Sequence, residues 1–171
     1  MKITNATIMF AVNEGGKEKA GVGDVTMPDI TFKTEEITGA GIMGSYNSVL
    51  AGQLEAMEMT INFRNTTEDY FKLSTPVNHT LDIRDAQQVD DSVADTTSVS
   101  KLKHIIRGKT ISATGGNIKT ASPHDATLKV AVNYWATYLD GKKIREIDIL
   151  NHICYIDGKD YFADVREALG E

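Results

Sequence analysis

Apolar and polar residues alternate along much of this chain, which is the pattern of β-strands that bury one face. The clearest run spans residues 128–138, where Leu, Val, Tyr and Ala occupy every second position. Asp-Gly pairs stand at 140–141 and 157–158, on either side of a second extended segment at 142–156. Because Asp-Gly favours two-residue hairpin turns, the C-terminal third predicts an antiparallel meander.

Weaker alternation predicts further strands, at residues 3–12, 25–37, 79–84 and 101–113. Residues 85–100 interrupt this pattern, because polar and acidic residues dominate the segment. A segment of that composition cannot bury much apolar surface. We therefore expect a long acidic loop over 85–100 that orders only against a partner.

Two segments predict helices instead of strands. Residues 65–75 begin with Asn65, which is placed to cap the helix, and Glu68 follows three residues later as in a capping box. Pro76 then ends the helix. A second, short helix is expected over residues 161–169, before a glycine.

Residues 37–63 carry a motif with two interpretations. Gly39, Gly41 and Gly44 have the G-x-G-x-x-G spacing with which dinucleotide-binding enzymes bring backbone close to a pyrophosphate. The same glycines precede an alternating run that ends at Phe63, and together these features predict a long β-hairpin with one face to bury. The first interpretation predicts an enzyme, and the second predicts a structural arm.

The residues around the motif favour the hairpin. A dinucleotide site needs a buried parallel strand before the glycines, but Lys33, Thr34, Glu35 and Glu36 occupy that place. It also needs helices alternating with strands afterwards, whereas strands with Asp-Gly turns dominate the rest of the chain. We therefore interpret Ile37 to Phe63 as an assembly hairpin, with a nucleotide-binding enzyme as the disfavoured alternative.

Composition narrows the class of protein further. The 171 residues are 41% apolar, which is enough for the core of one domain, and the formal net charge is −6. An acidic chain is a poor nonspecific ligand for nucleic acid, because such binding comes from cations that neutralise phosphates. The first residues resemble neither a secretory signal nor a spanning helix, so we expect a soluble subunit made in the cytoplasm without membrane insertion.

No constellation in the sequence predicts catalysis, a cofactor or a metal site. The four histidines fall in separate segments, and Cys154 is the only cysteine, so multi-thiolate zinc sites and an internal disulfide are excluded. The acidic residues near 82–95 lack the order and central glycine of a calcium loop. There is also no nucleophile-elbow motif. We expect a protein that is not an enzyme and binds no cofactor.

Three segments taken in order resemble a known family. They are PDITFKTEEITGAGIMGS at residues 28–45, the Arg-Gly-Lys triplet at 107–109, and YLDGKKIREIDILNHICYIDGKD at 138–160. Their order and spacing are similar to those of the major tail tube proteins of contractile-tailed bacteriophages, and also to the tubes of contractile bacteriocins. Each motif is weak by itself, and their combination carries the resemblance.

The resemblance implies a mainly β subunit that forms one tail tube domain over residues 1–171. The expected fold is an antiparallel β-sandwich or barrel-like subunit with one flanking α-helix and a long protruding hairpin. Six such subunits would form a ring and complete one continuous β-barrel, which removes the free sheet edges of a lone subunit. Stacked rings would form a hollow tube inside a contractile sheath.

Two sets of residues follow as expectations. Contacts between rings would come from the hairpin, at Gly39, Gly41, Gly44, Ser45, Tyr46, Val49 and Leu50. A repelling field for DNA would come from acidic residues that face the lumen, chosen among Glu55, Glu58, Asp82, Glu146 and Asp148.

The resemblance also implies a function and a location. The chain would be a structural tube subunit of the virion tail, assembled in the cytoplasm of the host bacterium, through which DNA passes without specific binding. Its partners would be further copies of itself, the sheath, the tape measure protein, and the baseplate and tail terminator proteins. The alternative within the same class is the tube of a headless bacteriocin or injection machine that carries no DNA.

Overall fold

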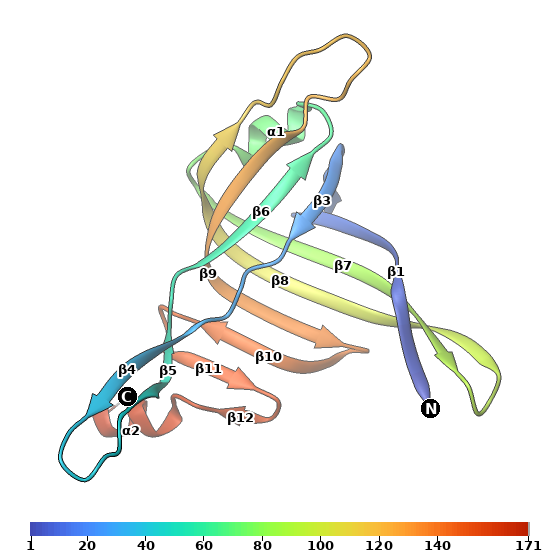
Figure 1. Ribbon diagram of the computed structural model, residues 1–171. Coiled ribbons are helices and arrows are strands. Elements are labelled where there is room, and N and C mark those ends of the chain that lie inside the picture. The colour runs from blue at the N-terminus through green and yellow to red at the C-terminus, as the bar shows by residue number, and fades with distance from the viewer. Residues whose placement is uncertain (171) are drawn as a thin grey trace.

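The structure is a computed structural model that describes residues 1–170, and it is built mainly of antiparallel strands (Figure 1). Its elements, in chain order, are β1 (Lys2–Glu14), β2 (Lys17–Glu18), β3 (Val22–Thr26), β4 (Phe32–Thr38), β5 (Ser45–Leu54), β6 (Met57–Phe63), α1 (Glu68–Leu73), β7 (Asn78–Asp91), β8 (Thr96–Thr114), β9 (Ala126–Leu139), β10 (Lys142–Asp148), β11 (Ile153–Ile156), β12 (Lys159–Asp160) and α2 (Ala163–Leu169). The expected mainly antiparallel β fold is confirmed.

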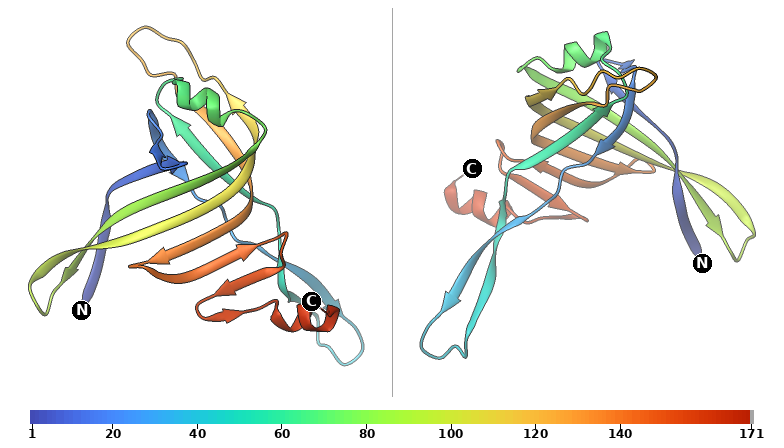
Figure 2. Two further views of the ribbon diagram at one scale, coloured as in Figure 1. Left: turned by 180° about the vertical axis from the view of Figure 1, so that it is seen from behind. Right: turned by 45° about the horizontal axis from the view of Figure 1, so that its top comes forward.

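Strand β9 holds the main sheet together. Along one edge it pairs with β8 from Thr127 to Leu139. Its other edge is shared, because β6 pairs with the first half of β9 and β10 pairs with the second half. The main path therefore runs β12-β11-β10-β9-β8-β7-β1-β2, with β6 and then β3 branching from β9. This branch folds the sheet back on itself into an open, barrel-like shape (Figures 1 and 2).

The hydrophobic core lies inside this fold, between the branch and the main path. Every second residue of β6, from Met57 to Phe63, is fully buried. These side chains pack with the β9 side chains that lie opposite them in the strand ladder. Leu81 and Ile106 close the core from β7 and β8. The alternation in the sequence therefore marks the inner face of the sheet.

Helix α1 covers one end of the core, but its start differs from the prediction. Thr67 is the N-cap, and its hydroxyl accepts a hydrogen bond from the Tyr70 amide at 3.3 Å. Asn65 instead accepts from the backbone amide of His124, which fixes the chain entering the helix to a distant loop. Tyr70 and Leu73 are buried against the core. The helix is shorter than the predicted 65–75 because the tertiary contact of Asn65 replaces its capping role.

The predicted loop over 85–100 is wrong. Strands β7 and β8 continue through this segment as a paired ladder as far as Asp91 opposite Thr96. Strand β1 pairs with β7 along the same stretch, so the segment is part of a three-stranded arm that extends beyond the core (Figures 1 and 2). Polar side chains are compatible with this arm because ladder hydrogen bonds use backbone groups and need no buried face.

The boundaries of the hairpin also differ from the predicted 37–63. Its strands are β4 and β5, which form a separate two-stranded sheet in the register of Thr38 opposite Ser45. Residues 57–63 are the core strand β6 instead. The polar run before the glycines is strand β4 itself, because an exposed ribbon does not require apolar residues on either face.

The base of the hairpin is anchored to the C-terminal part of the chain. Gly52 has a φ of +70°, and a Cβ placed there would lie 2.3 Å from the Phe162 ring. The ring therefore rests directly on the backbone of β5, next to helix α2. Figure 2 shows the hairpin leaving the sheet beside α2, and we infer that this contact anchors the base of the hairpin there.

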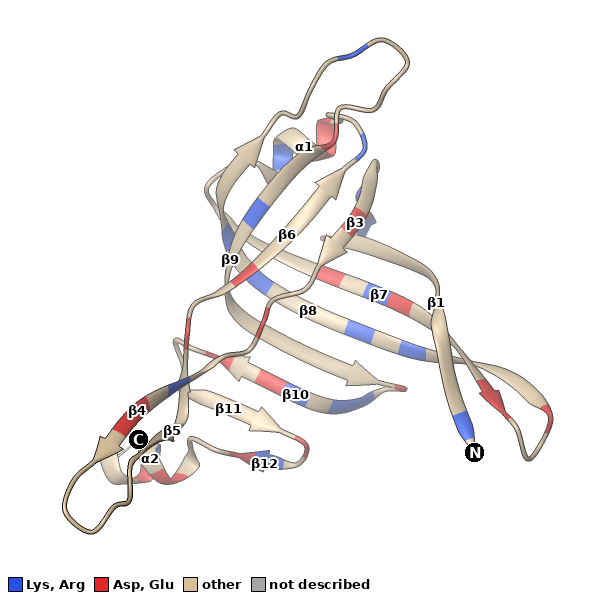
Figure 3. Ribbon diagram, in the orientation of Figure 1, with Lys and Arg blue, Asp and Glu red and all other residues tan. Residues whose placement is uncertain are grey.

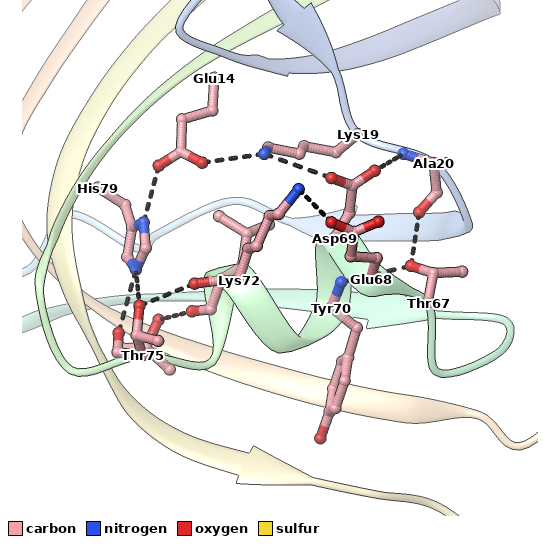
Figure 4. Close-up of polar contacts among 12 residues, drawn as sticks. Glu14, Lys19, Ala20, Thr67, Glu68, Asp69, Tyr70, Lys72, Thr75 and His79 are labelled. Carbon is pink, nitrogen blue, oxygen red and sulfur yellow. Dashed lines mark hydrogen bonds and ion pairs between the residues drawn. The ribbon is translucent and has the colours of Figure 1, made fainter.

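A charged network joins β1, β2, α1 and β7 at the covered end of the core (Figure 4). The Glu14 carboxylate accepts a hydrogen bond from His79 Nδ1 at 2.7 Å and forms an ion pair with Lys19 at 3.1 Å. Lys19 also reaches Asp69 at 3.4 Å, and Asp69 accepts from the Ala20 amide. Burial by itself would raise the pKa of the Glu14 carboxyl. The hydrogen bonds from His79 and Lys19 have a larger combined effect, so the pKa lies below its ordinary value.

Replacing Glu14 by Gln is expected to lower the free energy of unfolding by about 1–3 kcal/mol, because hydrogen bonds to a charged group contribute roughly this much. Since the folded-state pKa is depressed, the contribution of Glu14 is present above its ordinary pKa and is lost as the pH falls through the folded value. Urea unfolding at pH 7 and pH 3 measures both effects. The control Glu18→Gln, on exposed β2, should change stability by less than about 0.5 kcal/mol. Equal effects of the two substitutions would contradict the role of the network.

Replacing Gly52 by Val is expected to push the Phe162 ring away and to free the hairpin from its anchor, while the core remains folded. Limited proteolysis then cuts within 32–54 several times faster than in the unchanged protein. Gly141→Val is the matched control, since Gly141 also has a positive φ of +84° but a Cβ there meets nothing within 4 Å. Unchanged cleavage in the Gly52 variant would show that Phe162 does not hold the hairpin.

Candidate functional site

The β4–β5 hairpin presents an apolar surface that no other part of residues 1–170 covers. Tyr46, Val49 and Leu50 on β5 are 55%, 61% and 41% exposed, and Met43 in the connecting turn is fully exposed. The hairpin projects away from the barrel, beside α2 and the C-terminus (Figures 1 and 2). A ribbon with so much exposed apolar surface is typical of a docking element.

The glycines of the motif form the turn of this hairpin. Gly41 and Gly44 have φ values of +88° and +99°, which residues with a Cβ rarely adopt. No atom lies within 4 Å of the Cβ positions of Gly39, Gly41 or Gly44, so their role is backbone conformation and not close packing. Ser45 begins β5 opposite Thr38. The turn therefore has no cradle of neighbouring elements such as surrounds a bound nucleotide.

A second group of exposed apolar residues lies at the opposite end of the molecule. It consists of Phe71 on α1, Val77 after it, Ile111 near the end of β8, and Ile118 in the loop between β8 and β9. Figure 1 shows α1 and this loop at the end away from the hairpin. The loop is held at its neck, where Asn117 donates to the carbonyl of His124 at 2.8 Å. The two ends of one subunit thus carry separate apolar surfaces.

The free edges of the main sheet form a third surface. On one side, β2 pairs with only the last residues of β1, so the outer edge of β1 is unpaired along most of its length. On the other side the path ends at β12, which pairs with β11 through two residues. Ile3, Ile8 and Met9 are exposed along β1. Unpaired edges of this kind are ready to accept a strand from another chain.

The five acidic residues expected at the lumen do not form one cluster. Asp82 and Glu146 lie in one cross-strand row on the face of the main sheet away from the core, through Ile105 of β8 and Ala136 of β9. Glu58 lies on the exposed face of β6, and Glu55 is in the connection between β5 and β6. The Asp148 side chain is 92% buried by fold contacts, since it accepts from the amides of Leu150 and Asn151.

Basic partners accompany the acidic residues on that sheet face. Asp82 pairs with Arg84 at 2.9 Å and with Lys103 at 3.8 Å. Glu146 pairs with Lys143 at 2.5 Å and accepts a hydrogen bond from the Tyr134 hydroxyl at 2.9 Å. Burial and this hydrogen bond raise the pKa of Tyr134 to about 12. The face is therefore a mixture of charges.

Sequence reasoning missed the basic residues of β8. Lys101, Lys103, Arg107 and Lys109 stand at odd-numbered positions of one strand, and the buried residues between them show that all four face away from the core. The signal was present, because the run K-L-K-H-I-I-R-G-K alternates cations with less polar residues. The net charge of the whole chain is negative, at −6, and so does not indicate this local row of cations.

The structure shows no arrangement for metal binding within residues 1–170, where no three His, Cys, Asp or Glu side chains come together to hold an ion. Cys154 is buried, and burial raises the pKa of its thiol. His104 is packed beside Trp135, and burial followed by the charge of Arg145 lowers its pKa. In the same described part, no helix has the length and apolarity to cross a membrane.

Comparisons with known proteins show which family the chain is similar to. The family described as phage tail tube protein FII matches residues 4–170. The major tail tube protein of Serratia phage KSP20 is 26% identical over 172 residues, covering 99% of this chain and 98% of that protein. The tail tube protein of Escherichia phage P2 is 27% identical over 149 residues, covering 85% of each chain.

A solved structure shares the fold. It is a chain from the sheath/tube terminator of an extracellular contractile injection system in the extended state, which matches with a TM-score of 0.53 at 15% identity. The match covers 77% of this chain and 94% of that chain. At this identity the likeness concerns the fold alone. The family match extends over nearly the whole chain and confirms the resemblance in the three sequence segments: this chain belongs to the phage tail tube protein FII family.

Proposed function

We propose that this tail tube protein forms hexameric rings that stack into the inner tube of a contractile phage tail, and that this tube conducts DNA into the host. The observation that carries the proposal is the β4–β5 hairpin, an anchored ribbon with exposed apolar residues at the end of the subunit opposite a second apolar surface. Head-to-tail contacts between unlike surfaces repeat without limit along an axis, as a tube requires.

Stacking would place the hairpin of one ring on the α1 end of the next. Tyr46, Val49 and Leu50 would then be covered by surfaces such as those of Phe71 and Ile118, which are otherwise exposed to water. Burying apolar area contributes roughly 25 cal/mol per Å², so several such side chains in each of six subunits would stabilise a ring-to-ring contact strongly. Gly39, Gly41, Gly44 and Ser45 would shape the turn that makes this contact.

Ring formation would use the free sheet edges. The unpaired edge of β1 and the opposite end of the path at β11 and β12 lie on different sides of the subunit (Figure 1). Joining unlike edges of neighbouring copies closes a ring and removes both edges from water. The outward face of β7–β10, with Asp82 and Glu146, would then line the channel. Asp148 is left out of this role because its carboxylate stabilises a turn.

The other proposed partners are the proteins that would surround a tube in a contractile tail. The tube would contact the sheath on its outside, a tape measure protein inside it during assembly, and the baseplate and terminator proteins at its ends. Assembly would take place in the host cytoplasm, and the finished tube would belong to the virion tail. These partners are proposed from family membership and the surfaces described above.

Replacing Val49 by Asp is expected to abolish tubes, because a charge would be buried wherever the hairpin docks. The soluble subunit should keep its stability within about 0.5 kcal/mol, since Val49 is 61% exposed in the single chain. Negative-stain electron microscopy at high protein concentration measures tube formation, and thermal unfolding measures stability. The near-isosteric control Val49→Thr should still form tubes. Tubes of normal length from the Asp variant would place the stacking contact elsewhere.

The double substitution Gly41→Val and Gly44→Val should leave a soluble subunit that does not stack. Both positions have positive φ, which costs a β-branched residue about 1–3 kcal/mol each, so the turn changes shape to relieve the strain. Since nothing packs on these glycines within the subunit, the core is not affected. Sedimentation velocity separates free subunits from tubes. Unimpaired tubes would mean that the conformation of this turn is not needed for stacking.

A further inference from the structure

Strand β8 carries a row of cations on the face turned away from the core. Lys101, Lys103, Arg107 and Lys109 alternate with the inward residues, which include the buried His104 and Ile106. The ladder keeps these cations in line with outward residues of the neighbouring strands, since Arg84 of β7 is opposite Lys103 and Tyr134 of β9 is opposite Arg107. Figure 3 shows the basic positions spaced along β8. We call these four residues the β8 cation row.

Most of the β8 cation row has no acidic partner. Lys103 shares Asp82 with Arg84, at 3.8 Å and 2.9 Å respectively. Among residues 1–170, no carboxylate forms an ion pair with Lys101, Arg107 or Lys109. Glu146, two strands away, is paired with Lys143, and the Asp140 carboxylate accepts a hydrogen bond from the backbone amide of Lys101 at 2.8 Å. The face therefore offers free positive charge although the chain as a whole is acidic.

The surroundings of the row fix its shape. The guanidinium of Arg107 lies 4.1 Å from the centre of the Tyr134 ring, so it is held against the sheet. Lys101, Lys103 and Arg84 line a hollow that Glu18, Asp85 and Tyr138 also line. At ~3.4 Å per residue the row spans roughly 27 Å, and successive outward positions are ~6.8 Å apart. The cations form two pairs, Lys101 with Lys103 and Arg107 with Lys109, and Ile105 occupies the outward position between the pairs.

This arrangement fits a duplex nucleic acid. Each strand of B-DNA advances about 3.4 Å per phosphate, so an outward step on β8 corresponds to about two phosphates. Contacts of cations with phosphates need no base recognition and permit sliding. An acidic protein segment would also be attracted to these cations. Duplex DNA is favoured because its phosphates are present at every step along the surface and because the proposed tube conducts it.

We infer that the β8 cation row is a weak, sequence-independent contact surface for double-stranded DNA. The paired acids on the same face and the net charge of −6 keep the affinity low, so the duplex moves along the row and is not retained. In the assembled tail this inference rests on the proposed function, because the face must line the channel. The contact itself exists on the isolated subunit, where it is measured without assembly.

The test compares two double variants of the full chain with the unchanged protein. Lys101→Gln with Lys109→Gln removes two unpaired members of the row, whose side chains are exposed. Lys17→Gln with Lys119→Gln removes the same charge from exposed positions on β2 and in the loop after β8. Fluorescence anisotropy of a labelled 30-base-pair duplex is recorded from low to physiological salt. Circular dichroism confirms that each variant is folded.

We expect the unchanged protein to bind with an affinity that falls as salt rises, because binding releases counterions from the phosphates. The row variant should lose at least several-fold in affinity at low salt, and the slope of log K against log salt should decrease by about 2, since each lost phosphate contact contributes about 0.9. The loop variant should change affinity less than about twofold.

The inference is overturned if the unchanged protein shows no salt-dependent binding, if both variants lose affinity equally, or if an acidic peptide binds the row and DNA does not. Electron microscopy of the same samples keeps this result separate from the proposed function. If the unchanged protein forms tubes but does not bind DNA, the DNA contact of the β8 cation row is contradicted and the proposed assembly is not. If the unchanged protein binds DNA but does not form tubes, the proposed assembly is contradicted and the DNA contact of the β8 cation row is supported.

Discussion

The pairing of β9 with three strands is the constraint on which the rest of the structure depends. Because β6 and β10 share one edge of β9 while β8 takes the other, the sheet branches and folds over its own apolar face. The core therefore forms without a second layer of helices, and α1 needs only to cover one end. The same branch leaves the remaining strands free to extend past the core, where they form the arm and the hairpin.

Those extensions leave several surfaces of the single chain uncovered. The hairpin, the β1 edge and the α1 end all expose apolar side chains or unpaired backbone that the chain cannot bury by itself. A monomeric protein usually blunts such edges with charges or covers them. Here the edges and the apolar side chains are exposed. The contact of the Phe162 ring with Gly52 anchors the base of the hairpin. The hairpin is therefore anchored at its base as well as apolar on its exposed surface.

The charges follow a different principle from the apolar surfaces. Acidic residues on the outward sheet face are neutralised locally, as Asp82 is by Arg84, while several cations of β8 are unpaired. A mixed surface of this kind exerts weak forces on a passing polyanion in either direction. The acidic residues of the sequence predicted a repelling surface, and the placement of individual side chains shows a mixture of charges on this sheet face.

The sequence by itself determined the antiparallel β class, the C-terminal meander and the presence of a glycine-turned hairpin, because alternation and turn residues are local signals. The family was indicated separately, by the resemblance of three segments taken in order. Tertiary structure alone decided that 85–100 is an arm, that β6 belongs to the core, that Thr67 replaces Asn65 as the cap, and that the β8 cations share a face with Asp82. Strand pairing uses backbone groups that every residue carries, so partners as distant as Glu14 and Leu81 leave no mark in local composition.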